Sequence, residues 1–228
     1  DVNIGILWVF GIVSLGVYGI LIGGWASNNK YSLLGAIRAA SQNISYELAM
    51  GLAIIAILLF SGSLSTKAIV EGQQNGHWNI FYQPLGFIIF LICAFAECNR
   101  TPFDLPECET ELIGGYHTEY SSMKFALFFL GEYAAMIVGS AIIVTLFFVG
   151  WSLGFGLDTA ISNMALGGLL HILIFLTKVV AFVIFFIWVR WTVPRFRYDQ
   201  LMKLGWVVFF ELALVNIFIT AGIIMLLN

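Results

Sequence analysis

Uninterrupted apolar segments of about 20 residues recur along this sequence, and they constrain its fold more than any other feature. A helix needs about 20 apolar residues to cross a hydrocarbon core ~30 Å thick. About six such segments can be drawn, at residues 4–23, 44–63, 78–96, 123–150, 165–188 and 204–227. The chain is 61% hydrophobic and 10% charged, whereas average soluble domains carry roughly a quarter charged residues. The sequence therefore predicts an all-α, polytopic transmembrane helix bundle, with residues 1–228 forming a single transmembrane domain.

Basic residues concentrate on one side of the expected membrane. The connections after the first, third and fifth segments carry Lys30, Arg38, Arg100, Lys124, Arg190, Arg195, Arg197 and Lys203. The connections on the other side carry only Lys67. Positively charged loops remain on the cytoplasmic or matrix side, so both chain ends are expected on the opposite side. In the first connection, Leu33, Leu34, Ile37 and Ile44 recur at helical spacing, which predicts a short amphipathic helix lying in the interface before the second span.

An acidic stretch, at residues 97–122, separates the third and fourth apolar segments. It holds six of the 13 acidic residues, namely Glu97, Asp104, Glu107, Glu109, Glu111 and Glu119. Carboxylates beside hydrocarbon must be solvated, paired or protonated, which makes such a stretch a candidate for function. Neighbouring carboxylates also share protons, which suits proton exchange. The alternative is a solvated acidic loop without a chemical role.

Ionisable residues also occur within the apolar segments. Glu47 and Glu132 lie inside the second and fourth segments, where acids usually face a bundle interior or a water cavity. With Glu97, Glu119, His117 and Tyr116 they predict a chain of protonatable groups; the alternative for each is a structural hydrogen bond to a neighbouring helix. Lys178, in the fifth segment, needs a counter-charge or a water cavity, and one of these acids is a plausible partner. Glu211 is a lone acid without an obvious partner in the sequence.

The stretch AECNRTPFDLPECETELIGGYHTEYSSMKFALFFLGEYA closely resembles the signature region of one family. This family is a membrane subunit of respiratory complex I, the proton-pumping NADH:ubiquinone oxidoreductase; it is called subunit 1 in mitochondria and is the H-type subunit in bacteria. The stretches SLGVYGILIGGWASNNKYSLLGAIRAASQNISYE and PRFRYDQLM agree with it. Family members have about eight spans, so the resemblance implies that this chain corresponds to the last six and lacks the N-terminal two.

The resemblance implies a core subunit that contributes to the ubiquinone-binding chamber and couples quinone reduction to proton translocation, without catalytic activity of its own. The implied proton-path and coupling residues are Glu47, Glu97, Asp104, Glu107, Glu109, Glu111, Glu119 and Glu132. The implied quinone-chamber and interface residues are Arg38, Arg100, Phe103, Tyr116, His117, Arg195 and Arg197. Two alternatives remain open, the equivalent membrane subunit of a proton-pumping hydrogenase and an independent ion-coupled transporter.

Cofactors and partners follow from the same resemblance. Ubiquinone is the expected substrate of the complex, while NADH, FMN and the iron–sulfur clusters belong to other subunits. No cofactor or metal is expected on this chain, whose three cysteines form no metal-binding spacing. The expected partners are the hydrophilic subunits at the quinone site, the adjacent membrane-arm subunits, a separate chain supplying the two missing spans, and lipids, with no nucleic acid. The composition favours the mitochondrial inner membrane, and the bacterial plasma membrane is the alternative.

Overall fold

The fold is given by a computed structural model that describes residues 2–74, 77–105, 114–154 and 167–227. The long helices are α1 (Gly5–Ala26), α2 (Lys30–Ser61), α5 (Pro84–Glu97), α7 (Ser122–Phe147), α9 (Gly167–Thr192) and α11 (Phe210–Leu227). The short elements are α3 (Thr66–Gln73), α4 (Asn79–Tyr82), the 3-10 turn η1 (Gly115–His117), α10 (Tyr198–Lys203) and the π-helical turn η2 (Leu204–Phe209). The described ranges contain no strand, so the predicted all-α bundle is confirmed.

Five helical segments are long and apolar enough to cross a membrane: Gly5–Ala26, Lys30–Ser61, Ser122–Phe147, Gly167–Thr192 and Tyr198–Leu226. The expected third span is interrupted, because α4 ends at Tyr82 and α5 begins at Pro84 and runs for only 14 residues. Proline at a first helical position lacks the N–H that would continue the preceding turn, so it starts a new helix. The third apolar segment therefore crosses the bundle as a short helix preceded by a separate turn.

The structure corrects the expected interfacial helix, because α2 is one continuous helix of 32 residues. The side chain of Asn29 caps its start by accepting a hydrogen bond from the backbone N–H of Tyr31 at 3.0 Å. The apolar residues that suggested an interfacial face, such as Leu33 and Ile37, are exposed, whereas Gln42 and Asn43 on the other side are buried. The amphipathic pattern is real, but its polar side faces protein rather than lipid headgroups.

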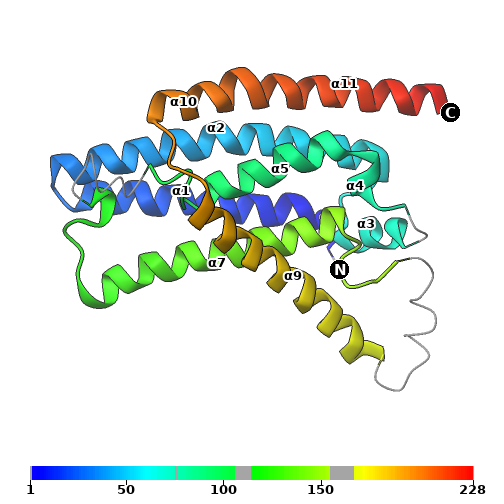
Figure 1. The fold of residues 1–228 in the computed structure, drawn as a ribbon, viewed down its shortest axis with the longest axis horizontal. Helices are drawn as coiled ribbons and strands as arrows, with labels where there is room; N and C mark the ends of the chain where they lie inside the picture. Colours follow the sequence, from blue (N-terminus) through cyan, green and yellow to red (C-terminus); the bar gives the residue numbers. More distant parts are fainter. Residues whose placement is uncertain (1, 75–76, 106–113, 155–166, 228) are drawn as a thin grey trace.

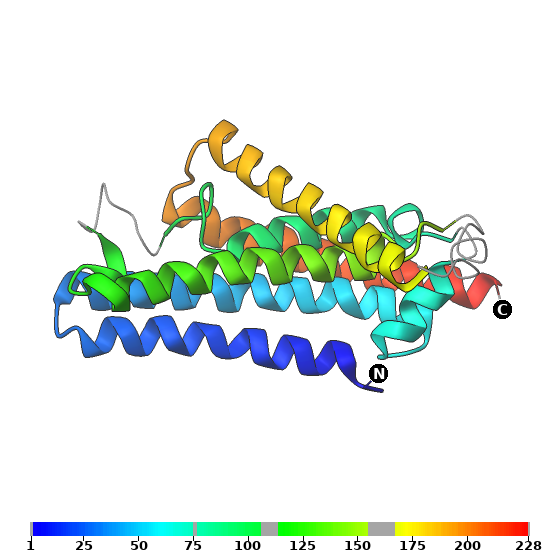
Figure 2. The same ribbon diagram turned by 90° about the horizontal axis from the view of Figure 1, so that it is seen from below.

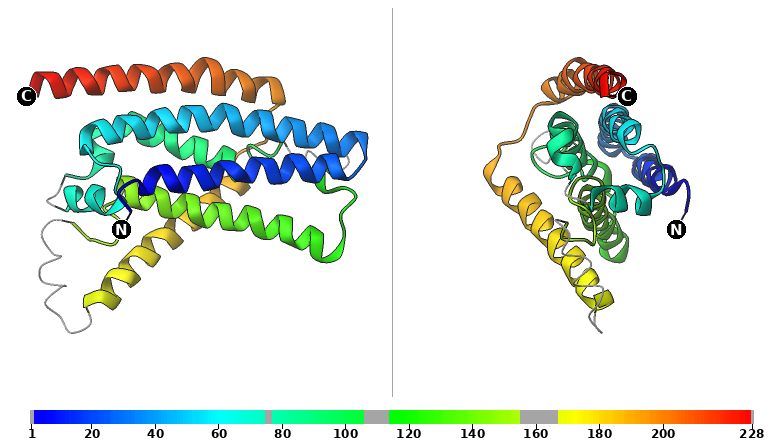
Figure 3. Two further views of the ribbon diagram at one scale, coloured as in Figure 1. Left: turned by 180° about the vertical axis from the view of Figure 1, so that it is seen from behind. Right: turned by 90° about the vertical axis from the view of Figure 1, so that its right-hand side faces the viewer.

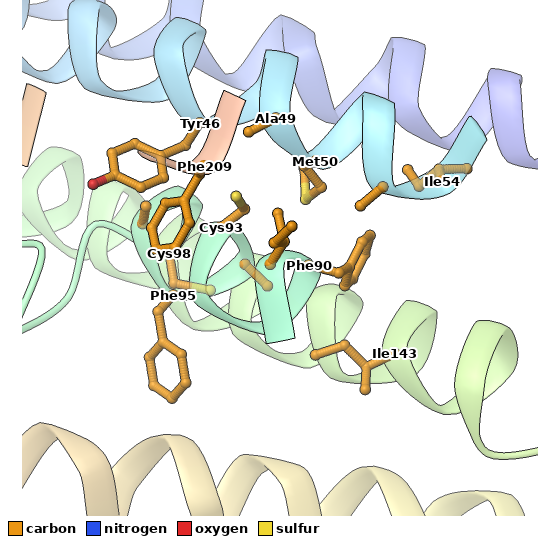
Figure 4. Close-up of a cluster of buried hydrophobic side chains, with 14 of the residues drawn as sticks. Tyr46, Ala49, Met50, Ile54, Phe90, Cys93, Phe95, Cys98, Ile143 and Phe209 are labelled. Carbon is orange, nitrogen blue, oxygen red and sulfur yellow. The ribbon is translucent and has the colours of Figure 1, made fainter. Parts of the chain in front are cut away.

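Helix α2 occupies the middle of the bundle, with α1, α5 and α11 packed against it (Figures 1 and 3). Helix α7 packs on α5, and α9 crosses α7 obliquely, so that one end of α9 diverges from the bundle (Figure 2). A buried apolar cluster joins the central helices through Tyr46 and Met50 of α2, Phe90 of α5, Ile143 of α7 and Phe209 of η2 (Figure 4). This cluster packs the middle of α2 against α5.

Gly24 sets the distance between α1 and α2. A Cβ atom built on it would lie 2.3 Å from the Cβ of Ala36 and 2.8 Å from the carbonyl oxygen of Ser32. We expect Gly24→Val to lower the free energy of unfolding by about 1–3 kcal/mol, because the two backbones must separate. Thermal unfolding of the purified protein in detergent measures the loss. Gly11→Val is the matched control on the same helix, since nothing lies within 4 Å of its Cβ position. An equal loss in both variants would contradict the prediction.

Candidate functional site

A cavity of about 220 Å³ lies between α1, α2 and α7, near the end of the bundle that carries the basic loops. Its polar lining consists of Asn43, Glu97, Asn99, Tyr116 and Glu132, and the rest of its wall is glycine, alanine and apolar side chains. A second cavity of about 220 Å³ continues along the seam between α1 and α7 and shares Glu97 with the first. Glu97 therefore stands between two cavities, at the end of α5.

Glu132 on α7 is buried and paired with Arg100, which follows the end of α5. The guanidinium nitrogen Nη2 lies 2.9 Å from Oε2 of Glu132, and the two side chains are only 5% and 6% exposed. The guanidinium also lies over the rings of Phe129 and Tyr133, at 5.0 and 4.8 Å from their centroids. A buried ion pair requires such close contacts, because each charge has lost its water. The predicted intramembrane acid thus has a defined cation.

Tyr116 reaches the same carboxylate from the acidic stretch. Its hydroxyl donates to Oε1 of Glu132 at 3.0 Å, and its backbone carbonyl accepts from the hydroxyl of Ser32 at 2.6 Å. Gly35 lets this segment lie against α2, since a Cβ there would sit 3.0 Å from the backbone nitrogen of Tyr116. The tyrosine ring packs edge-on against Phe128 at 5.2 Å. Side chains from two distant parts of the chain therefore hold the phenol on Glu132.

Asn43 and Asn99 are site residues that our sequence analysis missed. They are 5% and 3% exposed, and neither Oδ1 atom has a hydrogen-bond partner within the described residues. Both side chains line the cavity beside Glu97 and Glu132. Buried polar atoms beside a cavity of this size are suited to bind water. The signal that could have found them is the presence of amides beside apolar segments, with Gln42 and Asn43 directly before the second segment and Asn99 shortly after the third.

Glu47 and Glu97 form the second acidic part of the site. Glu47, on α2, accepts a short hydrogen bond from the hydroxyl of Ser14 on α1. It is also close enough to Glu97 to interact with it electrostatically. The carboxylates of α5 and α7 thus line the cavities, and the carboxylate of α2 lies beside that of α5.

Asp104 and Arg195 join the acidic stretch to the segment before α10. Nη2 of Arg195 lies 2.5 Å from Oδ2 of Asp104, whose side chain is 7% exposed. The two segments also share a backbone hydrogen bond, from the N–H of Phe196 to the carbonyl of Pro102 at 3.2 Å. Phe103 packs between the rings of Tyr46 and Phe196. This arrangement fixes residues 102–104 beside the middle of α2 and the end of α5.

The remaining predicted residues lie apart from the cavity. Arg38 covers the ring of Tyr198, with its guanidinium carbon 5.7 Å from the centroid, and Arg197 is exposed. Glu119 is exposed and accepts a hydrogen bond from Nδ2 of Asn29 at 2.6 Å. His117 packs against the rings of Phe125 and Phe129. The predictions for Glu107, Glu109 and Glu111 fall outside the described residues.

Lys178 has a role that the sequence analysis did not foresee. Its ammonium group donates to the backbone carbonyls of Phe148, Gly150 and Ser152, at 2.8, 3.2 and 2.5 Å. These carbonyls follow the end of α7, where the helix leaves oxygens without helical partners. A cation at a helix C-terminus is favoured there. The lysine thus fastens α9 to the end of α7.

Within the described residues, no group of three His, Cys, Asp or Glu side chains is placed to hold a metal ion. The residues in and beside the cavities are suited to proton exchange. They provide three buried or half-buried carboxylates, a phenol and an arginine, and the cavities have room for water. Carboxylic acids and water relay protons through hydrogen bonds without any bond to carbon forming or breaking.

Comparison with known proteins identifies the family of the chain. A family model described as NADH dehydrogenase matches residues 1–221. The chain is 57% identical over 226 residues to an H-type subunit of the NADH-quinone oxidoreductase of Cytophaga hutchinsonii, covering 99% of this chain and 66% of that protein. It is 57% identical over 227 residues to the H-type subunit of Flavobacterium johnsoniae (99% and 65%), and 49% identical over 230 residues to subunit 8 of the Rhodothermus marinus enzyme (97% and 67%). The chain spans about two thirds of the length of these relatives. It belongs to the NADH dehydrogenase family, as a multi-pass membrane protein of the H type.

Proposed function

We propose that this chain is the membrane subunit of an NADH:quinone oxidoreductase that couples the reduction of a quinone to proton translocation. The observation that carries the proposal is a series of three acids from three helices: Glu132 and Glu97 line one cavity, Glu97 also lines the adjoining one, and Glu47 lies close enough to Glu97 to interact with it electrostatically. The names of the similar proteins supply the reaction, and the buried acids supply a means of moving protons. The chain has no catalytic activity of its own, and electrons reach the quinone through other subunits.

The coupling step is electrostatic. Reduction of a quinone to a quinol takes up protons, so it changes the charge near the acidic stretch. Two unit charges about 4 Å apart interact by roughly 4 kcal/mol at an effective dielectric constant of ~20, which is enough to move a proton. Arg100 belongs to the acidic stretch and neutralises Glu132. A shift of Arg100 away from Glu132 favours protonation of that carboxylate, and its return favours release of the proton.

Water completes the path between the acids. Asn43 and Asn99 offer acceptor atoms to water in the cavity that Glu97 and Glu132 line. A proton released by Glu132 passes through this water to Glu97, and from there to Glu47 on α2. Tyr116 orients the carboxylate of Glu132 and takes part in the same network.

The acidic stretch, residues 97–122, forms the quinone-facing part of the chain in this proposal. Asp104 and Arg195 hold it to the segment before α10, while the rings of Phe103, Tyr116 and His117 pack within it and against the bundle. Arg38, Arg100 and Arg197 supply positive charge on the same side. Glu107, Glu109 and Glu111 belong to the coupling residues because they add charge that responds to the quinone, whereas Glu119, which is exposed and bonded to Asn29, lies outside the path.

Partners and location follow from the relatives. The chain assembles with further subunits, among them the hydrophilic subunits that carry NADH, FMN and iron–sulfur clusters, and the quinone is a ubiquinone or a chemically similar carrier. The relatives named above are bacterial, which favours a bacterial plasma membrane over the mitochondrial inner membrane that composition suggested. Residues 1–228 act as a single transmembrane domain within this assembly.

Glu132→Gln tests the proposal. The amide keeps the shape of the side chain and accepts from Tyr116, but it does not carry a proton at neutral pH. Because the change also removes the counter-charge of the buried Arg100, we expect less assembled complex; in the complex that assembles, quinone reduction and proton translocation should fall together by at least ~10-fold. Both rates are measured in native membranes, with assembly followed by native electrophoresis. Normal proton translocation by the assembled variant would remove Glu132 from the path.

A further inference from the structure

The last transmembrane segment carries an acid on its outer face. Within Tyr198–Leu226, the buried residues Gly205, Phe209, Ala213, Asn216 and Thr220 recur every three or four positions and face the bundle. Asn216 and Thr220 are fastened to Gln83, directly before α5, by hydrogen bonds of 3.0 and 2.7 Å. Glu211 lies about 160° around the helix from Ala213, at ~100° per residue, and is exposed. Its side chain therefore points away from the rest of the chain.

Glu211 lies too deep in the expected membrane for its carboxylate to interact with lipid headgroups. It follows Lys203 by about two helical turns, or ~12 Å, and sits in a segment apolar enough to cross a membrane. Its carboxyl group makes no hydrogen bond or ion pair with any residue that the structure describes. An acid at such a position is costly against lipid, and in membrane helices it usually faces protein or a water cavity. No cavity among those described reaches it.

The surface around Glu211 has the spacing of a helix-packing seam. Val208, Glu211, Val215, Phe218 and Gly222 follow one another at alternating intervals of three and four residues, and all are exposed. This is the a/d pattern of a left-handed helix pair, the commonest crossing in membrane bundles. The π-helical turn η2, directly before Glu211, rotates the stripe relative to an uninterrupted α-helix, and such turns often occur at functional sites. Figure 3 shows α11 at the periphery of the bundle, with its outer side uncovered.

We propose that this stripe is a docking surface for a transmembrane helix of another subunit, which presents a lysine, arginine or histidine to Glu211. Charge decides the kind of partner. A second copy of the chain, packed through the same stripe, would place Glu211 against Glu211, and like charges repel in a low-dielectric medium. A basic side chain at the same depth instead gives each charge its partner. The inference concerns assembly, and it stands independently of the proposed proton path.

Substitution and cross-linking together test the proposal in the complex extracted from native membranes. We expect Glu211→Gln to lower co-purification of the partner about 10-fold, because the partner's cation loses its counter-charge. Glu211→Asp should retain most of it. Leu212→Ala, on the same helix but off the stripe, is the matched control and should have no effect. A photoreactive benzoylphenylalanine in place of Val215 should cross-link to a transmembrane helix that carries a basic residue near the attachment point.

If Glu211 faces lipid, Glu211→Gln should not weaken the complex. If Glu211 contacted lipid, Glu211→Gln would leave the complex intact or make it more stable, since a charge would leave the hydrocarbon. That result overturns the proposal, as do cross-links to lipid alone, to a second copy of this chain, or to a helix without a basic residue. An equal loss in Leu212→Ala also overturns it, because the effect would then not depend on the charge.

Discussion

Arg100→Met should lower the free energy of unfolding by about 3–5 kcal/mol, because it leaves Glu132 buried without its cation. The two side chains are 5% and 6% exposed and 2.9 Å apart, so bulk solvent does not replace the guanidinium. Methionine fills a similar volume between Phe129 and Tyr133 but carries no charge. The loss therefore measures the cost of an uncompensated buried carboxylate rather than the cost of a cavity.

The double variant Arg100→Met, Glu132→Met separates charge from packing. Replacing both members of a buried ion pair by apolar side chains of similar volume is often nearly neutral for stability. We therefore expect the double variant to recover most of the stability that the single variant loses. Arg100→Lys should fall between the two, since it keeps the charge but loses the flat guanidinium that lies over the two rings.

Thermal unfolding of the detergent-solubilised protein compares these variants. The interpretation fails if Arg100→Met is as stable as the unmodified protein, or if the double variant is less stable than Arg100→Met. Either outcome would mean that the pair contributes through something other than mutual compensation of buried charge.

The class of fold could be predicted because it depends on segment length and hydrophobicity, which are local properties. The six apolar segments therefore correspond to the main helices, five of which are long enough to cross a membrane. The prediction of an interfacial helix was wrong because it depended on packing between helices, which the sequence pattern does not show. A helix with one polar and one apolar side has the same pattern whether the polar side meets headgroups or protein, and Gln42 bonds to the carbonyls of Ala96 and Phe103.

The members of the site were easier to predict than their partners. An acid within or directly after an apolar segment is visible in the sequence, so Glu47, Glu97 and Glu132 could be named. Their partners were harder to predict, because the ion pairs of Arg100 with Glu132 and of Arg195 with Asp104 form only where distant segments of the chain meet. Asn43 was missed because a neutral amide within a helix carries little sequence signal, and its importance comes from the cavity beside it.

Glu97→Gln should have the largest effect on activity, because Glu97 lines both cavities of the seam and lies near Glu47. Replacing its carboxyl group by an amide removes the group that binds the proton, so it interrupts the proposed proton path on both sides of α5. Glutamine preserves the volume and hydrogen-bonding capacity of the side chain, so the complex should still assemble. We expect quinone reduction and proton translocation to fall together by ~10²-fold, which is the usual contribution of a group that transfers a proton.

Glu119→Gln is the matched control for Glu97→Gln, since it removes an acid from the same stretch of sequence. Glu119 is exposed and its partner Asn29 can bond equally well to an amide, so both rates should remain near those of the unmodified complex. Both variants are compared in native membranes at equal amounts of assembled complex. Position distinguishes the two acids: water can replace a proton carrier at the surface, whereas Glu97 is the only acid among the described residues that lines both cavities. Equal losses in both variants would show that the acidic stretch acts through its total charge and not through a path of buried acids.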